Sequence, residues 1–570
     1  MNRILFTALY ILSTIITASA NESLPSLLES RGAALVAEAK AGRTNSKEVY
    51  SRFVELISAE LTKSGDTTTA NKFTTAKSNP SAADFPKTEF AWITQTFALE
   101  YYKEDIIRET GELIKFKTFA VTGVPNRKNP EFIKQKEYLR SLAEKLGLHF
   151  NDVDGYVQEI WIGDGPQTFG LMSHSDVQPV LPEEWSHDPW SGEVIDGKIW
   201  GRGAVDDKGP IVAIMYGMRA MLDSGFPLKK KIILLVGTDE ESENEDLANY
   251  LKVKAAPDQT IVVDSNFPVI CAEKGWCGYW LHIPKNAGSL KGKGLLVTSI
   301  QSGFSASIVP EKAAAKIVAQ RLQTVNAKNE IEKKIETFMK RRSGSKIEVY
   351  LAGDTLVVTA FGKTVHSAVP EQGHNALMDL LVFLDKDLKV LPNAYGLMAK
   401  FAARYIGFEL DGKSLGIAHT DDFMGSVTVA GNMFNTTDTT VMFMFNYRIP
   451  RGTDTITTMR EINSRFKRFE KEFGFKFSST HYMSNALYNA PNSPFVQKLL
   501  AIYNSVTKEN QKAQSIGGGT YAHRLPNAVV FGPALPDEEY LGHQPNEYFL
   551  VSTLVKNIEI LTHTMVEFGM

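Results

Sequence analysis

The stretch KKIILLVGTDEE, residues 230–241, is an apolar run that ends in acidic residues. It follows PIVAIMYGMRAMLDSG, residues 210–225, whose apolar residues recur at the spacing of an α-helix. Similar apolar runs occur in TFGLMSH, residues 168–174, and in TIVVDSNFP, residues 260–268. Strands that alternate with helices predict an α/β fold, with a mixed, largely parallel sheet that is covered on both faces.

Each of these apolar runs is followed by polar residues of the kinds that bind metal ions. His174 ends one strand, Glu240 and Glu241 follow the next, and Asp264 follows the third. In open α/β sheets, ligands bind at the carboxyl ends of the strands. Imidazole and carboxylate groups are ligands suited to zinc and similar divalent ions. The sequence therefore predicts a metal site at this edge of the sheet.

The segment GRGAVDDKGP, residues 201–210, places Asp206 directly beside Asp207. Two carboxylates that enter one site raise each other's pKa unless cations offset the repulsion. Two divalent ions about 3.5–4 Å apart would do so, and one carboxylate could bridge them. Asp176, two residues after His174, could orient that histidine. These residues favour a two-metal site that activates a water molecule.

Composition excludes several other classes of protein. The formal net charge of −3 gives no basic surface for nucleic acid. The only cysteines, Cys271 and Cys277, cannot form a zinc ribbon or a disulfide framework. We expect them to be buried free thiols rather than a local disulfide.

The chain is long enough for more than one domain, since it has 570 residues, of which 43% are hydrophobic. Between residues 285 and 475 the strands and helices continue, but the strands lack polar ends. We therefore predict an α+β lid domain over 285–475, inserted into a catalytic domain that comprises residues 92–284 and 476–570.

Residues 1–20 have the features of a secretory signal peptide. Arg3 precedes an apolar run, and the run ends in the small residues Ala18, Ser19 and Ala20. The run is short and interrupted by Thr and Ser, which disfavours a membrane span, although a retained anchor is the alternative. We expect an exported protein, periplasmic or secreted, with no stable membrane anchor.

Residues 21–91 are predicted to form a helical extension and a linker. Apolar residues at helical spacing predict two amphipathic helices over 23–63, with Asn45 and Ser46 as the start signal of the second. Residues 64–86 are rich in Thr, Ser, Ala and Asn and predict a linker or a long surface loop. The helices could form an added domain, a brace for the main body or a docking element, and a brace is favoured.

As a set, the motifs of the chain resemble a known family of enzymes. From about residue 95 to the C-terminus, the matching segments are SHSDVQP, GRGAVDDKGP, GTDEES, DSNFPVICAEKGW, GKTVHSAVPEQGHNAL, NYRIPRGTD, GGGTYAHRLPNAVVFGP and GHQPNEY. They resemble the dinuclear-zinc metallopeptidases that include aminoacylases, carboxypeptidase G and carnosinase. The chain is most similar to their PepV-type bacterial dipeptidases.

The resemblance implies two Zn²⁺ ions per chain, which Mn²⁺ or Co²⁺ could replace. One ion would be held by His174, Asp206 and Asp264. The other would be held by Asp206, Glu241 and His543, so that Asp206 bridges the pair.

The resemblance also implies the catalytic residues. Glu240 matches the general base, and Asp176 matches the carboxylate that orients His174. His366, in the inserted domain, resembles the histidine that stabilises the oxyanion. Asp207 matches a residue that is joined to the bridging aspartate by a cis peptide bond.

Substrate contacts are implied in the same way. Arg448 resembles the arginine that binds the terminal carboxylate of a dipeptide, and Gly518, Gly519 and Thr520 resemble a loop that lines the substrate. Ser307 stands where the dipeptidase branch often has an asparagine that assists the oxyanion. A serine reaches less far, so this departure affects the expected substrate preference more than the expected reaction.

Together these inferences predict an exported zinc dipeptidase of broad specificity that acts on small peptides. A metal-activated water would attack the peptide bond while Glu240 accepts its proton. The alternatives are an N-acyl-amino-acid deacylase with the same chemistry and a non-catalytic peptide-binding homologue. The length of the inserted domain favours a monomer over a dimer.

Overall fold

The computed structural model describes residues 23–78, 85–242, 244–288, 294–320 and 324–570. Two compact units are present. The first comprises the chain up to Pro268 with Lys498–Gln511 and Val530–Met570, and the second comprises Val269–Gln497 and Lys512–Val529. The predicted lid domain, residues 285–475, lies inside the second unit. The predicted signal peptide, residues 1–20, lies outside the described residues.

A mixed sheet forms the centre of the first unit. The five strands of this sheet that lie wholly within the unit follow the order β1 (His149–Val153), β2 (Val157–Ile162), β6 (Lys230–Gly237), β3 (Gln167–His174) and β7 (Gln259–Val262). The pairs β6–β3 and β3–β7 are parallel, whereas β1–β2 and β2–β6 are antiparallel. The last six residues of both β3 and β6 are buried, which confirms that these central strands are covered on both faces.

Helices α4 (Lys87–Ile114), α6 (Gly209–Ser224) and α13 (Val551–Gly569) pack against one another, and α6 and α13 also contact β6. A Cβ atom at Gly217 of α6 would lie 2.4 Å from Cε of Met565 on α13. It would also lie 2.7 Å from Oγ1 of Thr562, so a side chain at this position would force both α13 side chains to move, and the glycine leaves room for them.

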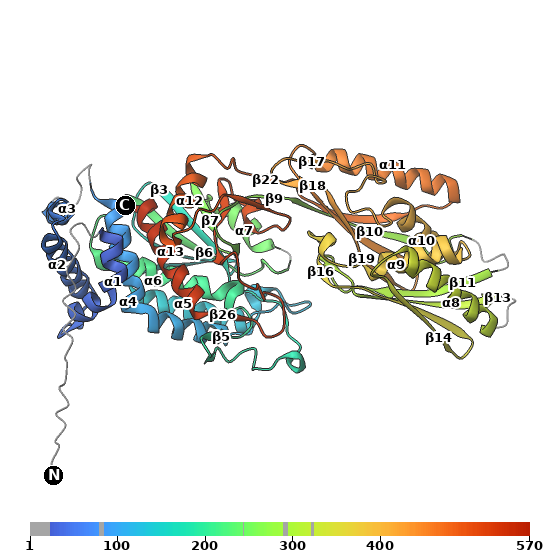
Figure 1. Cartoon of the computed structure of the whole chain (residues 1–570), viewed down its shortest axis with the longest axis horizontal. Coiled ribbons are helices and arrows are strands. Elements are labelled where there is room, and N and C mark those ends of the chain that lie inside the picture. Colours follow the sequence, from blue (N-terminus) through green and yellow to red (C-terminus); the bar gives the residue numbers. More distant parts are fainter. Residues whose placement is uncertain (1–22, 79–84, 243, 289–293, 321–323) are drawn as a thin grey trace, which may run out of the picture. The chain divides into compact units, whose positions relative to one another are not determined.

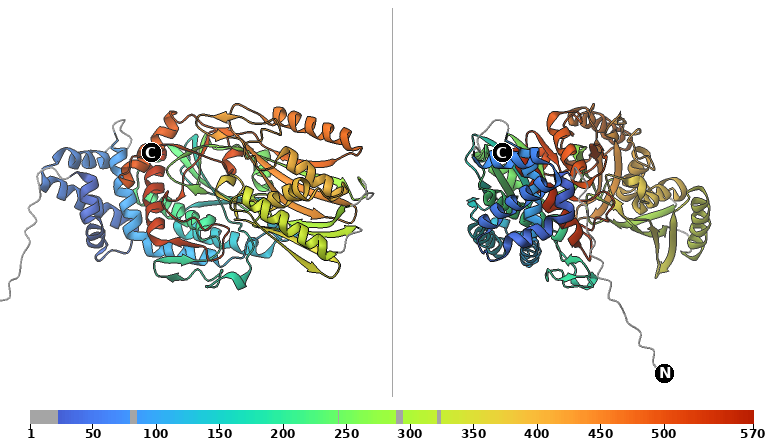
Figure 2. Two further views of the ribbon diagram at one scale, coloured as in Figure 1. Left: turned by 45° about the vertical axis from the view of Figure 1, so that its right-hand side comes forward. Right: turned by 60° about the vertical axis from the view of Figure 1, so that its left-hand side comes forward.

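The two predicted N-terminal helices are confirmed as α1 (Leu24–Lys40) and α2 (Ser46–Ser64). Helix α1 contacts α4, and α2 contacts α6 of the same unit. Both helices appear in blue in Figures 1 and 2. The side chain of Asn45 accepts a hydrogen bond from the backbone N of Lys47 at 2.9 Å and caps α2, as its sequence position predicts. Among the described residues, no helix is long and apolar enough to cross a bilayer.

The predicted linker over 64–86 is wrong in its first part, because residues 67–78 form helix α3 (Thr67–Ser78). Threonine is a weak helix former, so local propensity does not favour this helix. Ala70, Phe73 and Ala76 recur every three residues and are buried. The ring of Phe73 also packs edge-on against Phe90, with ring centroids 5.3 Å apart. Tertiary packing therefore overrides the local preference of the segment.

Asp223, near the C-terminal end of α6, joins the N-terminal helices to the main body of the first unit. Its carboxylate accepts hydrogen bonds from Ser46 Oγ of α2 at 2.7 Å, from Tyr102 OH of α4 at 2.6 Å and from Arg219 Nη2 at 2.6 Å. Asp223 is only 2% exposed. This contact supports the interpretation of the extension as a brace.

Replacing Asp223 by alanine should lower the free energy of unfolding by roughly 2–4 kcal/mol, because it leaves the Arg219 charge and two hydroxyl groups without their acceptor. Denaturant unfolding of the full chain measures the change. Asp105→Ala removes a partly exposed carboxylate of α4 that pairs with Arg108 and serves as the control. That control should cost no more than about 1 kcal/mol. Equal losses in the two variants would contradict the bracing role of Asp223.

An antiparallel sheet of eight strands forms the main layer of the second unit. The strands lie in the order β14 (Lys346–Ala352), β15 (Thr355–Phe361), β13 (Lys312–Gln320), β11 (Gly294–Ser302), β19 (Thr428–Thr436), β20 (Thr440–Ile449), β10 (Gly275–Pro284) and β21 (Ser478–Met483). Sheet and helices together give the α+β architecture that was predicted for the inserted part.

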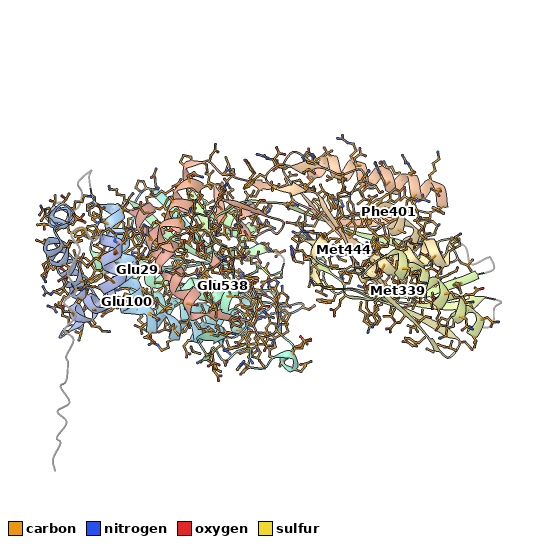
Figure 3. All side chains as sticks on the ribbon, in the orientation of Figure 1. Glu29, Glu100, Met339, Phe401, Met444 and Glu538 are labelled. Atoms are coloured by element: carbon orange, nitrogen blue, oxygen red, sulfur yellow. The ribbon has the colours of Figure 1, made fainter. Side chains whose placement is uncertain are left out.

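Helices α8 (Thr324–Arg341), α9 (Ala376–Val382) and α10 (Ala394–Tyr405) contact this sheet, and α11 (Thr455–Phe473) contributes buried residues to the same core. Figure 3 labels Phe401 of α10, which lies at the centre of an aromatic cluster. Its ring packs on Phe466 and Phe469 of α11, with ring centroids 5.5 and 5.4 Å away.

Two shorter strands of the second unit, β9 (Ile270–Glu273) and β23 (Gln514–Ile516), pair in parallel. Cys271 on β9 and Cys277 on β10 are buried and unbonded, which confirms the expectation of free thiols.

Candidate metal centre

Three predicted ligand segments meet because β6, β3 and β7 are adjacent parallel strands (Figure 1). The register pairs His174 at the end of β3 with Gly237 at the end of β6. Glu240 and Glu241 follow β6, and Asp264 follows β7. The carboxyl ends of all three strands therefore lie at one edge of the sheet, as the sequence predicts.

Two further segments reach the same edge through a smaller sheet. Strand β5 (Lys198–Trp200) pairs antiparallel with β26 (Tyr548–Leu550). The loop that carries Asp206 follows β5, and the loop that carries His543 precedes β26, so the pairing holds the two loops side by side. His543 has a φ of 67°, in the left-handed region that non-glycine residues seldom occupy.

The side chain of Asp206 lies at the centre of the cluster. Its Oδ1 is 3.1 Å from Nε2 of His174, and that nitrogen is 3.5 Å from Oδ1 of Asp264. Its Oδ2 is 3.1 Å from Nε2 of His543, and that nitrogen is 2.8 Å from Oε1 of Glu241. Asp206 thus directs one oxygen toward each of the two ligand groups that the sequence analysis defined. This is the arrangement expected of a bridging carboxylate.

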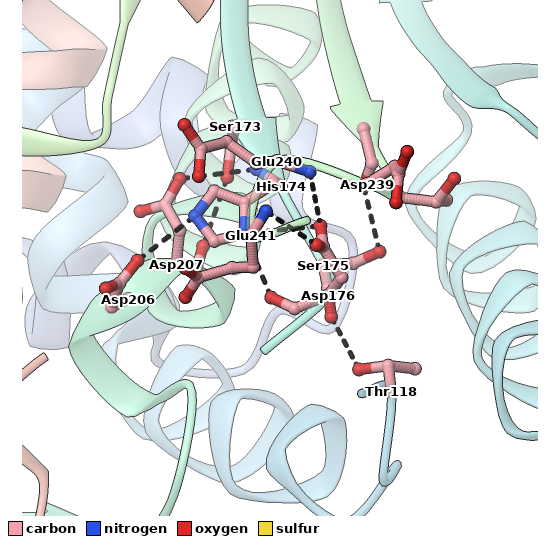
Figure 4. A network of polar contacts seen from close by, with 12 residues as sticks. Thr118, Ser173, His174, Ser175, Asp176, Asp206, Asp207, Asp239, Glu240 and Glu241 are labelled. Carbon is pink, nitrogen blue, oxygen red and sulfur yellow. Dashed lines mark hydrogen bonds and ion pairs between the residues drawn. The ribbon is translucent and has the colours of Figure 1, made fainter. Parts of the chain in front are cut away.

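Asp176 ties two of the strand ends together (Figure 4). Its carboxylate accepts hydrogen bonds from the backbone N atoms of Glu240 at 3.2 Å and Glu241 at 2.9 Å. The Nδ1 atom of His174 lies 2.9 Å from the backbone O of Asp176 and 3.5 Å from its carboxylate Oδ1. The nearer partner of the imidazole is therefore the backbone O of Asp176, while the carboxylate of Asp176 holds the backbone of Glu240 and Glu241.

Asp207 is buried beside the same cluster, and the peptide bond between Asp206 and Asp207 is cis, as the resemblance implies. The backbone O of Asp207 accepts a hydrogen bond from Ser173 Oγ at 3.1 Å. Its carboxylate Oδ1 is buried and has no hydrogen-bond partner. Ligand atoms of His174, Asp207 and Asp264 lie within 4.8 Å of one another, and so do those of His174, Asp206 and Glu241.

The raised pKa values of three carboxyl groups in the cluster, those of Asp207, Glu240 and Asp264, indicate that it lacks positive charge. Burial, together with the charge of Asp264, holds the pKa values of Asp207 and Glu240 well above their ordinary range. Burial also raises the pKa of Asp264 to about 6. Divalent cations are often the largest charges in such a site and reverse this effect. The unpaired Asp207 oxygen, the close ligand atoms and the excess of buried carboxylates all fit a site for divalent metal ions.

Glu547 and Arg202 hold the loop that carries Asp206. Glu547 is fully buried and accepts a hydrogen bond from Arg202 Nη1 at 2.6 Å through Oε2. Its Oε1 accepts from the backbone N atoms of Val205 at 3.2 Å and Asp206 at 3.3 Å. Burial raises the pKa of Glu547 to about 7. No pattern in the sequence singles out Arg202, because its partner lies more than 300 residues away.

The predicted oxyanion residues lie next to each other within the second unit. Strand β16 (Val365–His366) pairs with β12 (Ile308–Val309), and Ile308 is opposite His366. The backbone N of Ser367 donates to the backbone O of Ser307 at 2.8 Å. His366 is exposed, so its imidazole can be reached by a ligand.

Arg448 and the predicted substrate loop also belong to the second unit. Arg448 on β20 is 3% exposed, and its Nε has no hydrogen-bond partner. Burial lowers the pKa of its guanidinium to about 9. Thr520 bonds to Glu273, whereas a Cβ at Gly518 would meet only Ile516 at 3.6 Å. A buried arginine with an unused donor is suited to binding an anionic group.

The chain is similar to known proteins over most of its length. The sequence profile of "Peptidase family M20/M25/M40" matches residues 170–567. "Putative dipeptidase YtjP" of Bacillus subtilis (strain 168) is 30% identical over 473 residues, which are 82% of this chain and 97% of that protein. "Putative dipeptidase MW1694" of Staphylococcus aureus (strain MW2) is 31% identical over 468 residues, which are 79% of this chain and 94% of that protein. The crystal structure of human carnosine dipeptidase 1 aligns with a TM-score of 0.48 at 12% identity, over 82% of this chain and 97% of that one.

Proposed function

The chain belongs to peptidase family M20/M25/M40 and is a metallopeptidase, and from this premise we propose that it is a zinc-dependent dipeptidase of broad specificity. The observation that carries the proposal is the position of the Asp206 carboxylate, with one oxygen toward His174 and the other toward His543. A single-metal hydrolase has no need of such a shared carboxylate, whereas a two-metal hydrolase does.

We propose that His174, Asp206 and Asp264 hold one Zn²⁺ and that Asp206, Glu241 and His543 hold the other. Mn²⁺ or Co²⁺ could occupy the same oxygen and nitrogen ligands. The chemistry that divalent ions supply in such a site is polarisation of a carbonyl group and acidification of a bound water.

The proton transfers are assigned to Glu240. Its backbone N is held by Asp176, and the charges of Asp264 and His174 act on its carboxylate, which supports a position of this carboxylate beside the proposed ligands. Glu240 would accept a proton from the attacking water and then deliver it to the nitrogen of the leaving amine. The peptide bond would break in this step, and two amino acids would be released.

Further residues are proposed to bind the remainder of the substrate. The exposed imidazole of His366 would donate a hydrogen bond to the oxyanion, with Ser307, the residue that precedes the paired strand β12, nearby. Arg448 would bind the terminal carboxylate, which supports a preference for short peptides whose carboxylate is near the scissile bond. Gly518, Gly519 and Thr520 would line the bound peptide.

We also propose that the protein is exported to the periplasm or the medium and acts as a monomer. The motive for export is the charge, apolar run and small residues of the first 20 residues. Fractionation of the native producing cells, N-terminal sequencing of the mature protein and analytical ultracentrifugation test these two points. A protein that starts at Met1 in the cytoplasm, or that sediments as a dimer, would contradict them.

The proposed reaction is tested by comparing dipeptides that have a free N-terminus with the same dipeptides after N-acetylation. We expect the zinc-loaded protein to hydrolyse the free dipeptides with a kcat/KM at least about tenfold higher than that for the acetylated ones. A site that binds the free N-terminal amine loses the most transition-state binding when this amine is acetylated. Metal content is measured on the same sample. Preference for acetylated substrates would indicate the deacylase, and no turnover of either with metal bound would indicate a peptide-binding homologue.

A further inference from the structure

We propose that Glu273 is a positioning residue that holds the Gly517–Thr520 loop in place and thereby determines how tightly the peptide substrate binds. This inference rests on the proposed function, because it concerns the loop that is proposed to line the substrate. No motif in the sequence analysis assigned a role to Glu273.

The topology of the second unit brings Glu273 to the loop. Glu273 is the last residue of β9, and the loop begins immediately after Ile516, the last residue of β23. The two strands are parallel, and the backbone N of Lys274 donates to the backbone O of Ile516 at 3.0 Å. Because parallel strands end at the same edge of a sheet, the carboxylate and the loop leave the sheet side by side.

The carboxylate of Glu273 makes its contacts with the far end of this loop. Its Oε1 accepts a hydrogen bond from Thr520 Oγ1 at 3.0 Å, and its Oε2 accepts from the backbone N of Thr520 at 3.3 Å. Nε2 of His523 lies 3.2 Å from the same Oε2. Thr520 Oγ1 in turn accepts from the backbone N of Ala522 at 3.1 Å. The carboxylate therefore holds the end of the loop directly, and it reaches the turn that follows through Thr520 Oγ1.

Because Glu273 is buried, it depends strongly on these hydrogen bonds. Glu273 is 0% exposed, so its charge has little water to solvate it and depends on the groups that donate to it. The start of the loop follows Ile516, whose backbone O accepts from the backbone N of Lys274 at 3.0 Å, and it lies against Ala368, since a Cβ at Gly517 would be 2.8 Å from Cβ of that residue. With both ends constrained, the positions of Gly518 and Gly519 follow from the contacts of their neighbours.

The negative charge of Glu273 acts on the proposed anion-binding residue, Arg448. The charges of Glu273 and Arg448 interact, and the Arg448 guanidinium is 6.0 Å from the ring of Trp276. Nε of Arg448 and Nε1 of Trp276 are both buried and lack hydrogen-bond partners. The residue that fixes the glycine loop is therefore also part of the surroundings of the donors that would receive the substrate carboxylate. A role in substrate affinity, rather than in proton transfer, follows from this placement.

Steady-state kinetics of the zinc-loaded full chain with a free dipeptide test the proposal. In Glu273→Gln, an amide nitrogen replaces one of the two acceptor oxygens, and we expect KM to rise about 10- to 100-fold while kcat changes less than about threefold. Thr520→Val should raise KM in the same direction because it removes the hydroxyl donor. Thr520→Ser retains the hydroxyl and should restore KM to within about threefold of the wild-type value.

Glu159→Gln is the matched control. Glu159 is a buried glutamate of β2 that accepts hydrogen bonds from Tyr250 OH at 2.9 Å and Lys254 Nζ at 3.1 Å, so its loss should affect stability but leave KM unchanged. If Glu273→Gln does not fold, the Thr520 pair decides the question. If the wild-type protein is active but KM is unchanged in Glu273→Gln or in Thr520→Val, the inference about Glu273 is wrong, whereas the proposed function is unaffected. Wild-type protein that binds zinc but hydrolyses no dipeptide would overturn the proposed function and this inference with it.

Discussion

Replacing Glu240 by glutamine should lower kcat for dipeptide hydrolysis by roughly 10²- to 10⁴-fold, the range attributed to a general acid–base residue. Glutamine has the same shape as glutamate but cannot accept a proton at neutral pH. The backbone contact of residue 240 with Asp176 does not involve the side chain, so the loop should keep its conformation. The loss should therefore appear in kcat rather than in metal binding.

Metal analysis and denaturant unfolding separate this outcome from a general disruption of the site. Glu240→Gln should bind as much zinc as the wild-type protein and unfold at the same denaturant concentration or slightly above it, because burial disfavours the charged form of Glu240. Glu245→Gln provides the control, since Glu245 is an exposed carboxylate at the start of α7 (Glu245–Val253), in the same segment. Near-normal turnover of Glu240→Gln with full metal content would show that another group carries the proton.

The positions of the proposed ligands could be predicted because the end of each central strand is marked in the sequence by a change from apolar to polar residues. In β3 and β6 an apolar run stops and the side chain of a proposed metal ligand follows within a few residues, and parallel strands bring such ends to one edge. The pairing of Asp206 with His543 needed the family resemblance, because these residues are more than 300 positions apart and no local pattern connects them. The distances around Asp206 were beyond any inference from the sequence.

The contacts that support the site were less accessible to prediction. Arg202 and Glu547 form a buried ion pair between distant segments, and a charged residue in a polar loop has the same appearance whether it is buried or exposed. Glu273 is similar, since it ends an apolar strand as His174 does, but its carboxylate bonds to a loop of its own unit. Helix α3 was missed for a related reason, because its three buried residues lie in a segment rich in threonine, which disfavours a helix.

Asp206→Asn should reduce the zinc bound after metal loading from two ions per chain to at most one, and should lower activity at least about 100-fold. Asparagine keeps one carbonyl oxygen and the volume of the side chain, but it loses the negative charge and the second oxygen. In the structure these two oxygens face different partners, His174 at 3.1 Å and His543 at 3.1 Å. Because even residues that only orient a ligand cost 10- to 100-fold when replaced, loss of a shared ligand should cost more.

The effect on stability distinguishes a metal ligand from a catalytic residue. Zinc that binds only the folded chain raises the unfolding midpoint of the wild-type protein by mass action. In Asp206→Asn this increase should be smaller, whereas in Glu240→Gln it should remain. Asp196→Asn is the control, because Asp196 is exposed with a φ of 52°, a conformation that asparagine also tolerates. If Asp206→Asn still bound two zinc ions per chain with an unchanged midpoint shift, the carboxylate between His174 and His543 would not be the bridge, and Asp207, whose buried oxygen has no partner, would be the next residue to replace.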